Sequence, residues 1–279
     1  MFYIVTSLIA AGMMGAGDFF GGLAAKRAPV ALVGFIGQAI GLIVVAALIL
    51  FASESFAWAP FIIGVSAGAC GSIALLSLYR GLAVGRVAIV APLSAVLGAL
   101  LPVVVAIITG HDFGWMKWIG IVSGLVAVYV LSLPGSEDAE ENKETGLLHA
   151  IAAGVSLAFF YMLLGNKETH GSLWTLLGER ISVVTIMLLV MLIRRQFLIN
   201  RNTPALSYIL TAGACDIIGN LSFLHSATHG PLPMVALISS LYPASTLFLG
   251  WALLKEPLTK RLFLGIILSF ICITLFALH

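Results

Sequence analysis

Four ionisable side chains lie deep within apolar stretches of this 279-residue chain: Asp18, Glu179, Arg180 and Asp216. A charged side chain near the centre of a bilayer costs about 2.5–3.5 kcal/mol on insertion scales, so a retained one is a candidate for function. Carboxylates and a guanidinium in such a place can bind a polar solute or relay a proton. These residue types indicate a transport pathway, provided that the stretches around them cross a membrane.

Asp216 has a polar neighbour on its own predicted helix. Asn220 follows it by four positions, which puts both side chains on one helical face. Together they could offer an acceptor and an amide to a polar ligand. In the alternative interpretation, Asp216 pairs with Arg180 and holds two helices together.

Glu179 and Arg180 are adjacent and lie about 100° apart around a helix, so they cannot both face one partner. Gln38 falls close to Glu179 when the second helices of the two halves described below are aligned. A polar residue therefore occurs at a similar depth in the second predicted helix of each half. Gln38 and Glu179 either face a cavity or form interhelical hydrogen bonds that hold the bundle together.

Asp18 is followed by two aromatic residues, Phe19 and Phe20. An aromatic cluster beside a carboxylate could stack on a flat or cationic substrate. Aromatic residues near helix ends also form the belt at the membrane interface. The same two interpretations apply to Tyr79, Trp174, Tyr242 and Trp251.

Three prolines are predicted to lie inside helices: Pro92, Pro102 and Pro243. A proline inside a helix removes a backbone hydrogen bond and kinks the helix. Membrane helices tolerate this where a neighbour or a cavity satisfies the freed carbonyl. We therefore expect these helices to line the pathway and to act as its hinges.

Glycines spaced four positions apart predict close contact between helices. The pairs are Gly17/Gly21, Gly37/Gly41, Gly64/Gly68 and Gly120/Gly124.

Neither the histidines nor the cysteines are arranged as a metal site. His225 and His229 lack a third ligand, and we place them in a loop at the end of a helix. Each of the three cysteines, Cys70, Cys215 and Cys272, lies in an apolar segment with no second ligand nearby. We expect no metal and no cofactor.

The composition indicates that the chain lies in a membrane. Hydrophobic residues make up 61% of the chain and charged residues 9%, and the mean hydropathy is +1.12. These values are typical of an integral membrane protein, and the net charge of +2 gives no reason to expect a nucleic acid partner. Ten apolar segments are long enough to cross a bilayer, and we expect the first to remain in the mature protein. We place them at residues 3–24, 30–51, 59–79, 87–108, 115–133, 147–165, 172–193, 205–225, 233–254 and 261–278.

The second half of the chain repeats the first. Residues 66–109 align without a gap on residues 211–254, at a shift of 145 positions, and Ala67-Gly68-Ala69-Cys70 falls on Ala212-Gly213-Ala214-Cys215. The polar, acidic linker 134–145 separates a first five-helix repeat (1–133) from a second (146–279). Because five is odd, the two repeats cross the membrane in opposite senses. This predicts an inverted-topology repeat with a substrate site near the midplane.

Basic residues gather in the connections after odd-numbered helices, for example Lys26, Arg86 and Arg194. Arg80 and Arg86 flank the loop after the third span. This bias favours cytoplasmic odd connections and both termini outside.

Two stretches resemble the EamA family of the drug/metabolite transporter superfamily: LYRGLAVGRVAIVAPLSAV (78–96) and ALISSLYPASTLFLGWALLKEPLT (236–259). Within the second, residues 254–259 look like the Leu-Gly-Glu-basic/Pro-Leu-Thr turn of EamA repeats, with Lys255 at the glycine position. The resemblance implies an all-helical inverted repeat and an alternating-access carrier, often an exporter. It also implies both termini in the cytoplasm, which is the opposite of the charge bias.

We therefore predict a multi-pass secondary transporter of the plasma (inner) membrane that moves a small metabolite such as an amino acid or amine. It is expected to be a monomer or weak homodimer and could be proton-coupled. The alternatives are a multidrug or cationic compound exporter and an uncoupled exchanger. A membrane enzyme is disfavoured because the sequence offers no acid/base pair or metal cluster, and a channel because it has no rings of like residues.

Overall fold

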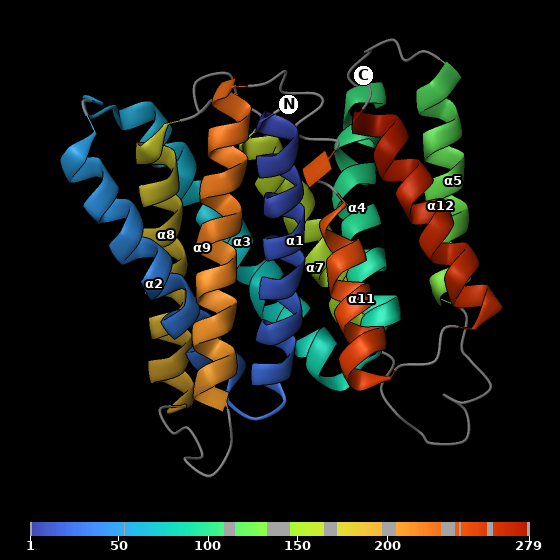
Figure 1. Cartoon of the computed structure of the whole chain (residues 1–279), viewed down its shortest axis with the longest axis horizontal. Helices are drawn as coiled ribbons and strands as arrows, with labels where there is room; N and C mark the ends of the chain where they lie inside the picture. Colours follow the sequence, from blue (N-terminus) through green and yellow to red (C-terminus); the bar gives the residue numbers. More distant parts are fainter. Residues whose placement is uncertain are drawn as a thin grey trace.

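The computed structural model describes residues 2–52, 54–108, 115–132, 146–164, 172–196, 205–229, 238–239, 241–255 and 259–277. Within these ranges the chain forms ten α-helices and no strands (Figure 1). Both ends of the chain lie on the same side of the helical bundle in Figure 1. The helices are α1 (Phe2–Ala25), α2 (Val30–Phe51), α3 (Trp58–Val84), α4 (Val87–Ile108), α5 (Trp115–Ser132), α7 (Leu147–Leu164), α8 (Leu173–Arg194), α9 (Ala205–His229), α11 (Tyr242–Leu254) and α12 (Lys260–Ala277).

The helices coincide with the predicted segments, and two of them run further than predicted. The third span is predicted to end at residue 79, but α3 continues to Val84, and the backbone N–H of Gly85 donates to the carbonyl of Gly81 at 2.7 Å. Nothing in the sequence breaks the helix before Gly85, and Arg80 can stay exposed at its end. Likewise α9 continues to His229, so His225 and His229 are helical and not loop residues.

The ninth predicted segment differs most. Residues 233–237 and 240 lie outside the described residues, and α11 begins at Tyr242. Pro243 therefore occupies the first helical turn, and its predicted place in a helix interior is wrong. Proline is favoured there because the first N–H groups of a helix have no intrahelical partner in any case. In contrast, α4 is one continuous helix through Pro92 and Pro102.

Length and composition agree with a membrane location. Five of the described helices, α1, α2, α3, α8 and the Ala205–Phe223 part of α9, are long and apolar enough to cross a bilayer. The remaining five carry shorter apolar stretches. Large apolar side chains are exposed around the bundle, such as Ile43 at 69% and Val122 at 59%. The chain is a multi-pass membrane protein.

Glycine contacts bring α3 and α8 together, as the pair Gly64/Gly68 predicts. A Cβ atom on Gly64 would lie 2.2 Å from the Thr175 carbonyl oxygen, and one on Gly68 would lie 2.5 Å from that of Glu179. From the other side, a Cβ on Gly178 would lie 2.3 Å from the Phe61 carbonyl oxygen. The two backbones touch, so these positions accept no side chain.

The residue that repeats Gly68 makes an equivalent contact. A Cβ on Gly213 of α9 would lie 2.8 Å from the carbonyl oxygen of Gly37 on α2. In the same way, α3 packs on α7 and α8, while α9 packs on α1 and α2. The third helix of each half thus packs on the first two helices of the other half.

Gly15 offers a test of this close packing. A Cβ there would lie 2.2 Å from the Tyr242 carbonyl oxygen of α11, whereas Gly12, one turn earlier on α1, has no neighbour within 4 Å of such an atom. We predict that Gly15→Ala destabilises the protein by about 2 kcal/mol, because a methyl group overfills the contact. Gly12→Ala is the control and should be neutral or slightly stabilising. Thermal unfolding in detergent measures both, and equal effects would contradict the contact.

The residue that ends α11 has a backbone conformation that is unfavourable for a residue with a side chain. Lys255 has φ 55°, in the left-handed region that favours glycine. It stands where the EamA turn carries glycine. We therefore predict that Lys255→Gly raises the unfolding free energy by about 1 kcal/mol. Lys255→Ala removes the charged chain but keeps the Cβ and should give no such gain. A gain from alanine as well would trace the effect to the lysine side chain and contradict the prediction.

Candidate functional site

A buried arginine, Arg180, links the three helices α2, α8 and α9. Arg180 of α8 donates from one terminal nitrogen to Asp216 Oδ2 of α9 at 2.7 Å, and from the same nitrogen to Gln38 Oε1 of α2. The Arg180 side chain is 2% exposed and that of Asp216 is 27% exposed. The pairing of Asp216 with Arg180, one of the two predicted interpretations, is therefore present. Part of the carboxylate remains accessible for other contacts.

Asn220 fixes the orientation of the Asp216 carboxylate. Its Nδ2 donates to Asp216 Oδ1 at 3.2 Å and to the Asp216 carbonyl oxygen at 2.8 Å. This confirms that the two side chains share one face of α9. Asp216 thus holds Arg180 with one carboxylate oxygen and Asn220 with the other.

Two glycines of α2 make room for this network. A Cβ on Gly41 would lie 3.3 Å from Arg180 Nε, and one on Gly37 would lie 3.8 Å from the Gly213 backbone. The Nε atom has no hydrogen-bond partner among the described residues. The predicted pair Gly37/Gly41 therefore brings α2 against both α8 and α9, and its second glycine accommodates the guanidinium.

Glu179 diverges from Arg180, as their adjacency requires. The Glu179 side chain is 9% exposed, and within the described part of the chain it has no hydrogen bond. It remains within electrostatic range of Arg180 and Asp216. Its carboxylate therefore adds a negative charge to the network without being tied by it.

A second group of polar side chains surrounds Asp18 of α1. Asp18 is half-buried and within electrostatic range of Asp216, Tyr79 of α3, Tyr161 of α7 and Tyr242 of α11. Tyr161 and Tyr242 share a hydrogen bond. The first group (Gln38, Glu179, Arg180, Asp216, Asn220) and this second group together form what we call the central cluster.

Tyr161 was not among our predicted site residues. The signal available was the recurrence of Phe159-Phe160-Tyr161 at the place of Phe19-Phe20 in the first half. The Tyr161 residue is 43% exposed, lies within electrostatic range of Asp18 and shares a hydrogen bond with Tyr242. Tyr79, in contrast, is 5% exposed and packs its ring on Gly21 of α1.

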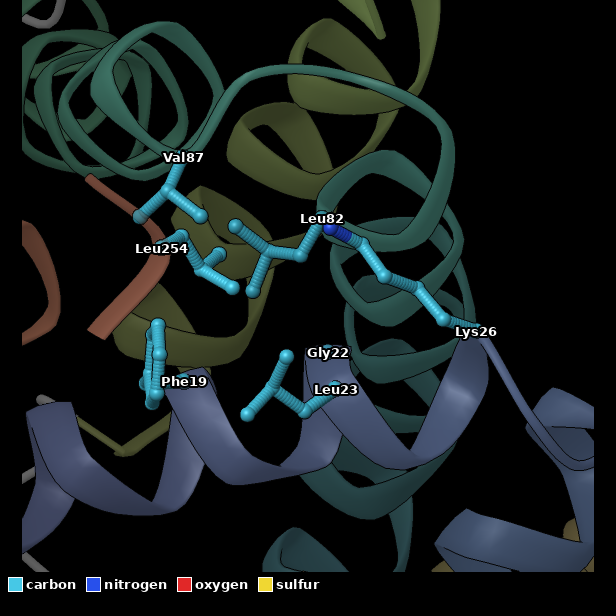
Figure 2. Close-up of a pocket in the computed structure, with 7 residues that line it drawn as sticks. All are labelled: Phe19, Gly22, Leu23, Lys26, Leu82, Val87 and Leu254. Atoms are coloured by element: carbon cyan, nitrogen blue, oxygen red, sulfur yellow. The ribbon is translucent and has the colours of Figure 1, made fainter. Parts of the chain in front are cut away.

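Phe19 lies outside the central cluster. It is 1% exposed and lines a closely packed apolar crevice at the end of α1 (Figure 2). Leu82, Val87 and Leu254 line the other side, and Lys26 extends its side chain toward Leu82. Apolar packing of α3, α4, α7, α11 and α12 continues around the crevice. Apolar side chains therefore close this end of the bundle.

Trp174 also lies away from the central cluster, in the first turn of α8. Its ring meets that of Phe56 edge to face, with centroids 4.8 Å apart, and Phe56 packs in turn on the exposed Trp58. Glu54 accepts a hydrogen bond from the Leu173 N–H at 3.1 Å and caps the helix. These are the contacts of an aromatic group at the end of two helices.

The described residues contain no group of three or more His, Cys, Asp or Glu side chains that could hold a metal. His225 and His229 stack with ring centroids 4.2 Å apart on the exposed end of α9. The three cysteines are free thiols.

Comparison with known proteins identifies the family. Residues 144–278 match the family described as "EamA-like transporter family". An uncharacterized protein of Methanocaldococcus jannaschii is 30% identical over 134 residues, which cover 48% of this chain and 93% of that protein. The chain belongs to the EamA-like transporter family. The predicted resemblance is thus confirmed, and the match covers the half of the EamA protein that contains Glu179, Arg180, Asp216 and Tyr242.

Structural similarity extends over nearly the whole EamA protein. A crystal structure titled only as that of a protein aligns with a TM-score of 0.61 at 16% identity and covers 95% of each chain. At this identity the likeness concerns the fold. The match to the EamA-like transporter family, together with the apolar helices, confirms two predicted features, a multi-pass helical membrane protein and membership of a transporter family.

Proposed function

We propose that this protein is an alternating-access carrier that exports a small organic metabolite, such as an amino acid or amine, across the plasma membrane. The observation that carries the proposal is the central cluster. Polar groups from α1, α2, α3, α7, α8, α9 and α11 converge in an apolar bundle, and two of them, Asp216 and Tyr161, are partly exposed. Buried polar groups in a membrane are costly and mark solute pathways.

The packing of the helices supports an inverted repeat as the scaffold of this carrier, with halves 1–133 and 146–279. Gly68 and Gly213 stand 145 positions apart, and each touches the second helix of the opposite half. The relative from M. jannaschii corresponds to about one half of this chain, which is what a duplicated unit predicts. Sites of such carriers lie between the repeats, and the central cluster draws on both halves.

Alternating access also requires that one end be closed while the other opens. The apolar crevice at the end of α1 supplies a closed end in this conformation, because Phe19, Leu82 and Leu254 pack together there. Opening it would separate the end of α1 from the ends of α3 and α11. The hinge role predicted for Pro92 and Pro102 stays part of this proposal.

The test is solute counterflow in proteoliposomes. Vesicles loaded with one unlabelled amino acid or amine are diluted into the same labelled solute at tracer concentration. A carrier gives transient, saturable accumulation above equilibrium, because inward and outward fluxes share one site. Linear uptake without counterflow for every solute of the panel would indicate a channel, and no protein-dependent uptake would contradict the proposal.

A further inference from the structure

Acidic side chains outnumber basic ones in the central cluster. Its ionisable side chains are three carboxylates, Asp18, Glu179 and Asp216, and one guanidinium, Arg180. Arg180 is already committed to Asp216 at 2.7 Å. The pair neutralises itself, and two carboxylates remain without a cationic partner in the described part of the chain.

Of these two, Asp18 is placed to meet a ligand. Within the described residues, Asp18 has neither a hydrogen bond nor an ion pair, and its side chain is half-buried. Glu179 is likewise without a hydrogen bond but is 9% exposed. An unpaired buried charge is costly, so a site of this kind is completed by a cation.

The groups around Asp18 are aromatic. Tyr161 and Tyr242 share a hydrogen bond within electrostatic range of it, and Tyr161 is 43% exposed. Tyr79 stands on a third side, against Gly21 of α1. Aromatic faces attract cations through their quadrupole, and phenol oxygens can accept hydrogen bonds from an ammonium group.

We propose that the central cluster binds its substrate as an organic cation, with Asp18 as the counter-ion of an ammonium group and Tyr161 and Tyr242 as the walls beside it. The inference rests on the proposed carrier function and adds the charge class of the solute. Arg180 takes no part in binding an anionic group of the substrate, because Asp216 occupies it. An anion would meet the remaining carboxylates unfavourably.

Four solutes that share one phenyl ring test the charge class: phenethylamine, 2-phenylethanol, phenylacetate and L-phenylalanine. Their dissociation constants for the purified, reconstituted protein are measured by titration calorimetry. We expect phenethylamine to bind tightest and phenylacetate weakest. Asp18→Asn should weaken phenethylamine binding roughly ten- to hundredfold, the worth of one charged hydrogen bond, while Asp18→Glu should retain most of the affinity.

Glu54→Gln is the matched control. It removes one carboxylate from the end of the bundle, where Glu54 contacts Ser172 and Leu173. Affinity for phenethylamine should be unchanged, since that carboxylate caps the first turn of α8 and is not part of the central cluster. An equal loss in Glu54→Gln and Asp18→Asn would trace the effect to net charge and overturn the inference.

The outcomes separate this inference from the carrier proposal. Binding and counterflow of phenylacetate or phenylalanine without phenethylamine would leave a carrier and overturn the cation site. Binding of phenethylamine that depends on Asp18, without counterflow of any of the four solutes, would support the site and contradict the carrier. Absence of binding by phenethylamine would overturn the inference, as would full binding by Asp18→Asn.

Discussion

Replacement of Arg180 by methionine is expected to lower the unfolding free energy by about 3 kcal/mol, because it leaves the Asp216 carboxylate buried without its cation. Arg180 is 2% exposed and contacts α2 and α9 at once, so the variant also frees Gln38. Methionine fills a similar volume, which limits any cavity effect. Thermal unfolding of the detergent-solubilised protein measures the loss.

The second half of this test is the double variant Arg180→Met/Asp216→Asn. It removes both charges and should recover at least about 1 kcal/mol of the loss, because an uncharged pair has little desolvation cost. Gln38→Leu is the control for the hydrogen bond to α2. If the double variant is as unstable as the sum of the single ones, the ion pair is not what Arg180 contributes.

The other large effect is expected in transport. Asp216→Asn should abolish gradient-driven transport while exchange of solute continues, if the Asp216 carboxylate exchanges the coupling proton. One charge moved through ~100 mV is worth ~2.3 kcal/mol, or about fiftyfold in accumulation, and this is the quantity that the variant should lose. Asparagine keeps the shape of the side chain and can still accept from Arg180, so the fold is expected to persist.

Uptake driven by an imposed pH gradient and counterflow without a gradient are compared in the same proteoliposomes. Asn220→Ala is the control, because it removes the neighbour that donates to Asp216 Oδ1 and leaves the acid. Gradient-driven uptake should survive in that variant. Unchanged driven uptake in Asp216→Asn would remove Asp216 from the coupling role and leave it as the partner of Arg180.

Most of the helical framework follows from the sequence because membrane helices are limited by length and apolar composition alone. The predicted helix ends differ from the structure where a charged residue or a proline suggests an end or a kink that the backbone does not have. The third span is predicted to end just before Arg80, but a charged side chain can extend from the last turns of a helix, and α3 ends only at Val84. The sequence predicts that Pro243 kinks a helix, but in the structure α11 starts at Tyr242, so Pro243 lies in its first turn.

The central cluster was predicted in part. The i, i+4 spacing of Asp216 and Asn220 was enough to place them on one face, and the contact confirms it. The pairing of Asp216 with Arg180 was one of two predicted interpretations, whereas the contact of Gln38 with Arg180 depends on how α2 packs on α8, which spacing along one helix does not encode. Tyr161 was missed for the same reason, since its role depends on its facing Tyr242 across two helices.

The most direct test of the central claim is thiol labelling in intact membranes. In a variant without Cys70, Cys215 and Cys272, a cysteine replaces Tyr161, and a membrane-impermeant maleimide is added. Phe159→Cys is the control, because Phe159 is 54% exposed on the same helix but lies two residues away, on the opposite face. We predict that Tyr161→Cys is labelled and Phe159→Cys is not, because the proposed carrier has a water-accessible pathway at Tyr161 and lipid at Phe159. A Tyr161→Cys variant that reacts only after denaturation would contradict it.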